Sequence, residues 1–444
     1  MSPADEPTLR PPRPVLDIAE RLEEAGFETW CVGGAVRDAL LGQPDLDWDL
    51  ATAATPQQVR RLFRRTVPVG IEHGTVGVLD DDGRMHEVTT FRRDVETDGR
   101  HAKVVFSQSI DEDLARRDFT INAIAWSPAR GVLHDPFDGR ADLQGRLVRA
   151  VGVPEERMQE DRLRALRAIR FAARLGFEIE PATWRAITAS APFLDRLSAE
   201  RVKQELEKTM EQVTAPSRAL RLWKESGALA VLVPPLAAVS PLVLQALDYL
   251  PRPGLPGRPQ RKINRLTMLF LGMDAKATSA ALRALRFSNA EVAWITAQVE
   301  RWRRIGPEIE RVVADGEPLT DGRIRRWAAT AGRTRIAPLL RLGAALWASK
   351  CEAGLLPNRV RRLTGLYRRT LQVAWRDPIE LSDLAVDGDD LRREGVPSGP
   401  AIGKFLQRLL ERVLDDPSLN TRDGLLAMVR EWLAGDDEPS SGER

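Results

Sequence analysis

The spacing of apolar residues changes along the chain. In the first part, short apolar runs at residues 29–32, 75–79 and 85–91 predict strands, and Asp80-Asp81-Asp82-Gly83 predicts a hairpin turn between the last two. Residues 35–41 have the spacing of a helix, and residues 124–134 that of a second hairpin. This part of the chain is therefore predicted to mix helix and strand.

From about residue 154 onward, the pattern is helical. Residues 155–175 carry apolar side chains at steps of three and four, which predicts a helix across this whole range. Residues 197–210 continue the same spacing, and several more helices are predicted up to about Leu433. Residues 251–261 are rich in proline and glycine, which predicts an exposed loop or linker.

Two aspartates lie at alternate positions of one predicted strand. In residues 46–50, apolar side chains occupy one face, and Asp47 and Asp49 occupy the other. Carboxylates on one face coordinate hard cations such as magnesium, and two such ions about 3.5–4 Å apart activate an attacking oxygen and stabilise a leaving phosphate. An edge strand with a polar face has the same pattern, so the aspartate pair alone does not distinguish a metal site from such a strand.

A glycine pair precedes this strand. Gly33-Gly34 follows a predicted strand and opens a predicted helix, so that backbone N–H groups can approach an anion, and Arg37 adds positive charge. The sequence therefore predicts a phosphate site, although a tight turn with an Arg37–Asp38 pair explains the same residues. A Walker loop is excluded, because no Gly-Lys-Ser/Thr follows.

The composition narrows the class of protein. The chain has 444 residues and a net charge of +2, which predicts two to four globular domains. Its basic residues are almost all arginine, which binds phosphate in a bidentate manner, although a genome that favours arginine codons gives the same composition. Cys31 and Cys351 are the only cysteines, which excludes a disulfide framework and a zinc cluster and fits a reducing cytosol.

No membrane segment is predicted. The most apolar stretch, residues 228–247, is interrupted by Pro234, Pro235 and Pro241, whereas a spanning helix needs about 20 continuous apolar residues. Residues 1–14 lack the apolar core of a signal peptide. We therefore expect a soluble, cytoplasmic protein.

Four motifs resemble those of one enzyme family. Gly33-Gly34-Ala35-Val36-Arg37-Asp38 and Asp47-Trp48-Asp49-Leu50-Ala51-Thr52 resemble the first motif of bacterial class II CCA-adding tRNA nucleotidyltransferases and poly(A) polymerases. Residues 116–123 resemble the family's motif for nucleotide and ribose recognition, 160–164 its base-recognition motif, and 200–206 a later helical motif. The four occur in the family's order and cover roughly the first half of the chain.

The resemblance implies an α+β fold and a template-independent reaction. A nucleotidyltransferase head with a mixed β-sheet is expected, followed by an all-helical neck, body and tail. The 3′ hydroxyl of tRNA would attack the α-phosphate of CTP or ATP and release pyrophosphate. The implied boundaries are a flexible segment at 1–14, the head at 15–150, the neck at 151–215, an RNA-binding body and tail at 216–435, and a disordered tail at 436–444.

The resemblance also assigns the site residues. Asp47 and Asp49 would bind Mg²⁺, with Glu87 as a third catalytic carboxylate, although a lone strand glutamate is more often simply exposed. The implied nucleotide-binding residues are Gly33, Gly34, Arg37, Arg116, Arg117, Asp118, Asn122, Asp161 and Arg164. Of these, Asp118 would accept from a ribose hydroxyl, although an Arg-Arg-Asp cluster is more often solvated surface.

The side-chain chemistry of Asp161 and Arg164 suits the recognition of a nucleotide base. Three residues apart on a predicted helix, they share a face, and one accepts a hydrogen bond while the other donates. Cytosine and adenine both present an amino group beside an acceptor nitrogen, whereas uracil and guanine present the opposite order. A mismatch leaves polar groups unpaired, at about 1–3 kcal/mol each. An ordinary helical salt bridge between the two residues has the same spacing.

Further sequence features bear on which activity of the family this chain has. Residues 92–103 resemble the family's flexible loop for switching from CTP to ATP, although any mobile surface loop fits. No histidine follows His134, which excludes the C-terminal phosphohydrolase domain of some relatives. A poly(A) polymerase, an A-adding enzyme and a non-catalytic RNA-binding protein remain alternatives, and the oligomeric state stays open. Arg325, Arg326 and Arg333 are expected to contact tRNA phosphates in the helical half.

Overall fold

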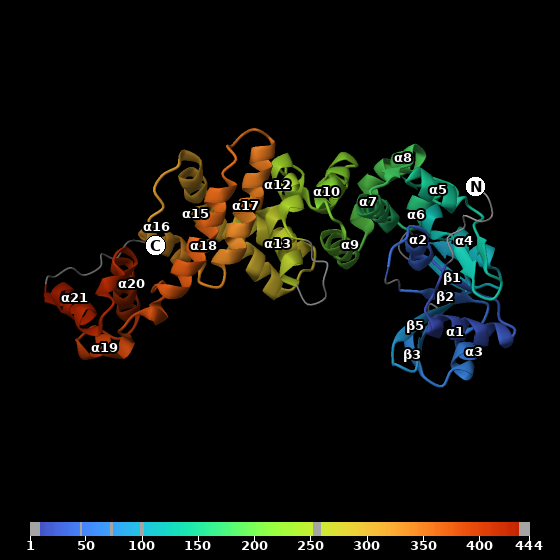
Figure 1. Ribbon diagram of the computed structural model, residues 1–444, viewed down its shortest axis with the longest axis horizontal. Coiled ribbons are helices and arrows are strands. Elements are labelled where there is room, and N and C mark those ends of the chain that lie inside the picture. The colour runs from blue at the N-terminus through green and yellow to red at the C-terminus, as the bar shows by residue number, and fades with distance from the viewer. Residues whose placement is uncertain (1–8, 45–46, 72–73, 98–101, 252–258, 435–444) are drawn as a thin grey trace. The chain divides into compact units, whose positions relative to one another are not determined.

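The chain folds into two compact units in this computed structural model, which describes residues 9–44, 47–71, 74–97, 102–251 and 259–434 (Figure 1). The units divide between Ala237 and Ala238. The segments expected to be flexible or disordered at 1–8 and 436–444 lie outside the described residues. Within the expected flexible N-terminal segment, Leu9 is buried and the first helix already begins at Arg13. The boundary expected at 215–216 stays a prediction.

A mixed sheet forms the base of the first unit. Its seven described strands have the order β3-β4-β5-β2-β1-β8-β9, and β2 and β5 are parallel whereas all their other neighbours are antiparallel. The strands are β1 (Thr29–Val32), β2 (Asp49–Thr52), β3 (Thr66–Gly70), β4 (Thr75–Leu79), β5 (Met85–Thr90), β8 (Ala125–Ser127) and β9 (Val132–His134).

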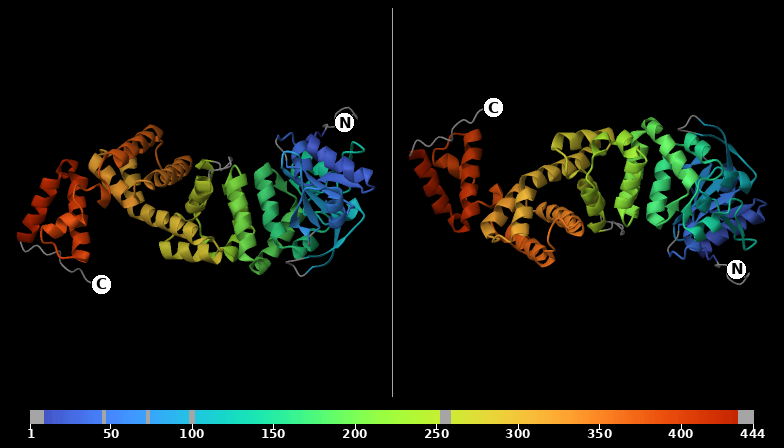
Figure 2. Two further views of the ribbon diagram at one scale, coloured as in Figure 1. Left: turned by 90° about the horizontal axis from the view of Figure 1, so that it is seen from below. Right: turned by 90° about the horizontal axis from the view of Figure 1, so that it is seen from above.

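Helices cover this sheet and extend the unit. The helices α1 and α3 pack against each other and against the strands, and α3 begins with a Thr55–Gln58 capping box (Figures 1 and 2). The first unit contains α1 (Arg13–Glu24), α2 (Gly34–Leu40), α3 (Pro56–Leu62), α4 (Ile110–Ala115), α5 (Gly139–Gly145), α6 (Pro154–Glu160), α7 (Leu163–Leu175), α8 (Pro181–Ser190), α9 (Ala199–Gln212), α10 (Pro216–Glu225) and α11 (Ala228–Leu232).

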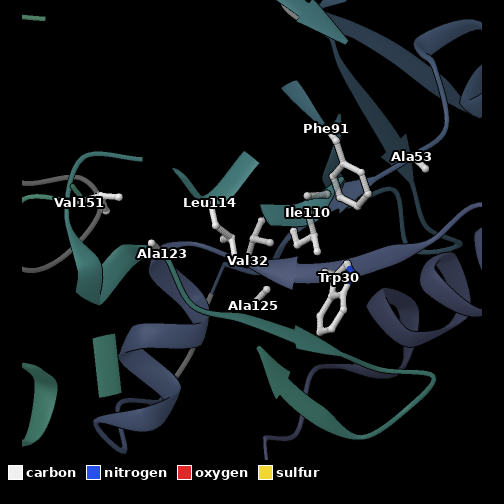
Figure 3. Packing of buried hydrophobic residues seen from close by; sticks show 10 residues of the cluster. Trp30, Val32, Ala53, Phe91, Ile110, Leu114, Ala123, Ala125 and Val151 are labelled. Atoms are coloured by element: carbon white, nitrogen blue, oxygen red, sulfur yellow. The ribbon is translucent and has the colours of Figure 1, made fainter. Parts of the chain in front are cut away.

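One apolar cluster fixes the strand that carries the glycine turn. Trp30 and Val32 lie on one face of β1 and pack with Ile110 and Leu114 of α4 and with Phe91, which follows β5 (Figure 3). All four residues of β1 are buried, so both of its faces are covered. The end of β1, and with it the turn that follows, is thus held by the core of the unit.

The expected flexible loop at 92–103 is wrong in part. Residues Arg92–Thr97 and Ala102–Phe106 form the antiparallel strands β6 and β7, while 98–101 lie outside the described residues. Their sequences contain valine, threonine and phenylalanine, which favour strands, among charged residues. The charged residues suggested a loop, but they do not prevent the segment from pairing as two strands.

The second unit is helical throughout its described residues. It contains α12 (Pro241–Ala246), α13 (Pro259–Phe270), α14 (Ala275–Ala284), α15 (Asn289–Asp315), α16 (Asp321–Ala331), α17 (Ile336–Glu352), α18 (Val360–Arg376), α19 (Gly388–Arg393), α20 (Pro400–Asp415) and α21 (Arg422–Ala434). In the parts of the chain that are described, no helix combines the length and the apolar character that a membrane crossing requires.

The predicted α+β architecture is confirmed, with one addition. After residue 150 the described chain is helical apart from β11 (Glu178–Ile179), which pairs with β10 (Leu147–Val148) in a small parallel sheet. This pair ties the last strand of the head to the segment after α7. Both cysteines are free thiols, as the sequence predicts.

We predict that Phe91→Ala lowers the free energy of unfolding of the first unit by about 3–5 kcal/mol, because the ring is fully buried in the cluster around β1. Urea denaturation followed by circular dichroism measures this loss. Phe106→Ala, at a ring that is 42% exposed, is the matched control and should cost about 1 kcal/mol. Equal losses in the two variants would contradict the assignment of Phe91 to the core.

Candidate active site

A cavity of about 630 Å³ lies in the first unit and collects nearly all the predicted site residues. The turn after β1, the strands β2 and β5, the segment after α4 and the helices α7 and α9 supply its walls. The predicted residues that line it are Gly33, Gly34, Arg37, Asp49, Glu87, Arg116, Arg117, Asp118, Asn122, Asp161 and Arg164. Asp47 is the one predicted residue outside the lining.

Two carboxylates are placed side by side by the sheet register. In the parallel pair β2–β5, Leu50 lies opposite Val88, so Asp49 and Glu87 are the preceding residues on adjacent strands. Alternate residues of a strand point to opposite faces, and Leu50 and Val88 are fully buried. Asp49 and Glu87 therefore share the face that borders the cavity, with Glu87 exposed and Asp49 half-buried.

Asp47 acts on Asp49 through its negative charge. The expected strand at 46–50 is wrong at its start, because β2 begins at Asp49, and Leu46 lies outside the described residues. Asp47 is thus an exposed residue of the approach to the strand, and strand alternation does not place it. Burial, followed by the negative charges of Glu87 and Asp47, raises the pKa of Asp49 to about 6, against an opposing effect of Arg117.

The glycine turn requires glycine at its first position. Gly33 has a φ of 77°, a conformation that side-chain-bearing residues rarely adopt. A Cβ there would lie 3.0 Å from Nη1 of Arg117 and 4.0 Å from Oδ2 of Asp49. The missing side chain therefore lets a backbone segment, an arginine and a carboxylate meet at one wall of the cavity.

Arg37 is engaged inside the protein. Its Nε donates to Asp38 at 2.7 Å, so the pairing that the sequence offered as an alternative is present. Its Nη1 donates to Oδ1 of Asn122 at 2.6 Å, and its guanidinium stacks over the ring of Phe171. Arg37 is buried, and its charge reaches the cavity from within the wall.

Asp118 is a buried hub of hydrogen bonds. Its Oδ1 accepts from the backbone N–H of Phe119 and from Nδ2 of Asn122, both at 2.9 Å, and its Oδ2 accepts from Nε of Arg167 at 2.8 Å and from Nη2 of Arg167 at 2.6 Å. Burial alone would raise the pKa of this carboxyl, but the charge of Arg167 and the hydrogen bonds from Asn122 and Arg167 outweigh it and lower the pKa. A carboxylate has about four acceptor positions, so protein donors fill those of Asp118.

The shared helix expected for Asp161 and Arg164 is wrong. The range 155–175 is split into α6 and α7, and Asp161 has an extended backbone (φ −146°, ψ 105°) at the break. Oδ1 of Asp161 accepts from the N–H of Leu163 at 3.0 Å, which caps the start of α7. The apolar spacing runs through the break because both short helices pack their apolar sides inward.

The two proposed base readers nevertheless line the same cavity, each held by another partner. Oδ2 of Asp161 accepts from Arg201 at 2.8 Å. Arg164 donates to Glu160 at 2.6 Å and to the carbonyl of Arg116 at 3.0 Å. The alternative of a salt bridge between Asp161 and Arg164 themselves does not account for these contacts.

The sequence prediction missed a basic wall. Four arginines of α7 point into the cavity at steps of three and four, and α9 adds two more cations; these are Arg164, Arg167, Arg170, Arg174, Arg201 and Lys208. The spacing of the α7 arginines is a helical stripe, a signal that the sequence contains. In all, basic residues outnumber acidic ones on the cavity wall, which suits a polyanionic ligand such as a triphosphate.

Known proteins match this chain in sequence and in fold. Residues 29–149 match the Poly A polymerase head domain, and 176–239 match the probable RNA and SrmB-binding site of polymerase A. A CCA-adding enzyme of Limosilactobacillus fermentum is 35% identical over 432 residues, which is 96% of this chain and 97% of that protein. The chain belongs to the CCA-adding enzyme family. It is therefore a nucleotidyltransferase.

Further relatives agree. A CCA-adding enzyme of Streptococcus pneumoniae is 42% identical over 282 residues, covering 62% of this chain and 65% of that protein. The crystal structure of the Bacillus stearothermophilus CCA-adding enzyme in complex with CTP is 32% identical, with a TM-score of 0.75 over 96% of this chain and 98% of that one. The Thermotoga maritima CCA-adding enzyme complexed with tRNA is 22% identical at a TM-score of 0.63, which shows the shared fold.

Enzymes of the CCA-adding family use a divalent metal, and the carboxylates here fit one. Asp49 lies beside the negative charges of Glu87 and Asp47, which Arg117 offsets only in part, and a divalent cation would neutralise the excess. Among the described residues, no three histidine, cysteine or acidic side chains are gathered closely enough to hold an ion by themselves. A divalent cation can be held by one or two carboxylates and take its remaining ligands from water and substrate phosphates.

We predict that Asp118→Asn destabilises the protein by about 3 kcal/mol while leaving the preference for CTP over 2′-deoxy-CTP unchanged. The variant breaks a buried, hydrogen-bonded charge pair with Arg167, and protein donors already fill the acceptor positions that a ribose hydroxyl would need. Urea denaturation and kcat/KM for both nucleotides measure the two effects. Glu87→Gln, at an exposed carboxylate of the same cavity, is the stability control, and a changed ribose preference in Asp118→Asn would assign Asp118 to the ribose instead.

Proposed function

We propose that this protein adds C and A nucleotides to the 3′ end of tRNA without a nucleic-acid template, using CTP and ATP. The observation that carries the proposal is the single cavity in which Asp49 and Glu87 face a basic wall and the pair Asp161 and Arg164. Carboxylates, phosphate-binding arginines and a donor–acceptor pair are the three components that the reaction needs. The CCA-adding enzymes that resemble this chain include structures solved with CTP, with ATP and with tRNA.

Each wall of the cavity has its own part in the reaction. Asp49 and Glu87, with Asp47 beside them, would hold Mg²⁺, which when bound activates the attacking hydroxyl and neutralises charge on the phosphates. The arginines of α7, with Arg116 and Arg117, would hold the triphosphate. The 3′ oxygen of the RNA then bonds to the α-phosphorus, the bond to the β-phosphate breaks, and pyrophosphate leaves.

Base choice would follow from hydrogen-bond order. Asp161 offers an acceptor to the amino group of cytosine or adenine, and Arg164 a donor to the adjacent ring nitrogen. Arg201 and Glu160 hold the two side chains at the cavity wall, which limits the rotamers that each samples before a base arrives. Protein side chains would thus take the place of a template.

The helical parts would hold the RNA. We propose that the neck at 151–215 presents the base readers and that residues 216–435 bind tRNA, with a cytoplasmic location where tRNA and both nucleotides occur. Arg325 does not fit the phosphate contact expected for it, since it is buried and donates to Asp377 and to the carbonyl of Leu414. Arg326 and Arg333 are likewise paired, with Asp415 and Asp383.

The deciding experiment supplies tRNA lacking its last three nucleotides together with CTP, ATP and Mg²⁺. We expect two C additions and one A addition by the protein and none by Asp49→Ala, which should still bind tRNA, because that carboxylate faces the reacting phosphates without contributing to the core. Denaturing gels resolve the products nucleotide by nucleotide. A long A tail would indicate a poly(A) polymerase, addition of A alone an A-adding enzyme, and tRNA binding without any addition a non-catalytic protein.

We predict that Arg164→Ala and Asp161→Ala reduce selectivity against UTP and GTP as well as the rate. Loss of either group removes a mismatch penalty of about 1–3 kcal/mol, so the kcat/KM ratios between correct and incorrect nucleotides should fall roughly tenfold or more. The ratios are measured for all four nucleotides on a primer that ends just before CCA. Arg174→Ala, at the same cavity wall but paired with Asp38, is the control and should slow all four nucleotides alike. Unchanged ratios in both test variants would remove the template role.

A further inference from the structure

Positive charge is concentrated in one stretch of the second unit. Between Asp321 and Asp377 the sequence has 55 residues with thirteen arginines and lysines and a single acidic residue, Glu352. The whole chain has a net charge of only +2, so the remainder is net negative. Such asymmetry within one chain is typical of a nucleic-acid contact rather than of a general codon preference.

Most of these cations are used inside the unit. Arg323, Arg325 and Lys350 pair with acidic residues of neighbouring helices, and Arg362 donates to two backbone carbonyls. The arginines of α18 and of the segment just before it differ in whether they have an acidic partner. In the described parts of the chain, Arg359 before α18 and Arg361 and Arg368 within it make no ion pair, and all three are exposed.

The two unpaired arginines of α18 share a line with an exposed tryptophan. Arg361, Arg368 and Trp375 are spaced by seven residues, which places them on one face of the helix over about 21 Å. Trp375 is 62% exposed, unusual for the largest apolar side chain, although the guanidinium of Arg333 lies over one face of its ring, 5.7 Å from the centroid. The other face of the ring is the one on which a base can stack. Gly365 and Gln372 lie on the same exposed face, and α18 contains no acidic residue at all.

We propose that this face of α18, defined by Arg361, Arg368 and Trp375, is an RNA-binding surface. The arginines contact backbone phosphates, and the indole stacks on an unpaired base. That the RNA is tRNA rests on the proposed function. The surface lies outside residues 176–239, which match the RNA-binding family model, so it is a second point of contact on the RNA.

The chemistry of the face selects RNA as its occupant. Unpaired, exposed arginines on a helix without acidic residues attract a polyanion, and releasing its counterions drives binding. An exposed aromatic ring beside them offers a stacking platform for a base that is not in a helix, worth about 1–3 kcal/mol per base. A helix docking face for protein would instead present several apolar residues in a row, and here Trp375 is flanked by arginine and glutamine.

The test compares tRNA affinity at a series of salt concentrations. Arg361→Ala/Arg368→Ala should weaken binding about tenfold at low salt and reduce the salt slope by about two units, because two phosphate contacts are lost. Trp375→Ala should weaken binding roughly tenfold with little change of slope, and Trp375→Phe should restore most of it. Thermal melting followed by circular dichroism verifies that each variant is folded, as expected for exposed side chains.

The matched control removes the same charge from two arginines that are already paired, one on α18 and one on α21. In Arg369→Ala/Arg430→Ala both lost arginines are exposed but already paired, with Asp321 and Glu394, so the affinity and slope should stay close to those of the unmodified protein. Equal losses in test and control, or an unchanged slope in Arg361→Ala/Arg368→Ala, would overturn the proposal. Nucleotide addition is scored separately at saturating tRNA, and its absence in the unmodified protein would contradict the proposed function while leaving this binding comparison valid.

Discussion

The arrangement of the cavity depends on one buried carboxylate. Asp118 follows α4 of the head, and it accepts hydrogen bonds from Asn122 and from Arg167 on α7 of the neck. Asn122 in turn accepts from Arg37, which is fixed by Asp38 after the glycine turn. A charge buried at this depth is tolerated only when its hydrogen bonds are complete. The requirement to satisfy Asp118 therefore sets the position of the phosphate-side wall relative to the neck.

The wall that carries the carboxylates, in contrast, brings together like charges that repel one another. Asp49, Glu87 and Asp47 place like charges together, and burial, followed by the negative charges of Glu87 and Asp47, raises the pKa of Asp49 to about 6. Repulsion of this kind costs stability unless a cation relieves it, so it marks a binding site rather than a structural element. Strand β1 is buried on both faces, and its last residue, Val32, lies opposite Asp49 of β2, so the glycine turn after β1 is held beside this carboxylate.

The sequence predicts those parts of the structure that local chemistry decides. Strand β4 has the bounds that alternation indicates, and Gly33 has the positive φ that a glycine before a helix suggests. The break at Asp161 was missed because apolar spacing continues across it, and only the capping bond to Leu163 reveals it. The partners of Asp161 and Arg164, namely Arg201 and Glu160, depend on which helices meet, and spacing along one helix holds no information on that.

Arginine illustrates why composition alone does not locate function. In this chain the same residue type packs in the interior at Arg325, closes ion pairs at Arg369 and stands unpaired at Arg368. A paired arginine must exchange one anion for another to bind phosphate, so its net gain is small, whereas an unpaired one gains the full interaction. Folding determines how acidic residues are distributed around each arginine, and this distribution therefore decides where an RNA backbone is held. Among the described helices, α18 is one in which exposed arginines and an exposed indole lie on one line.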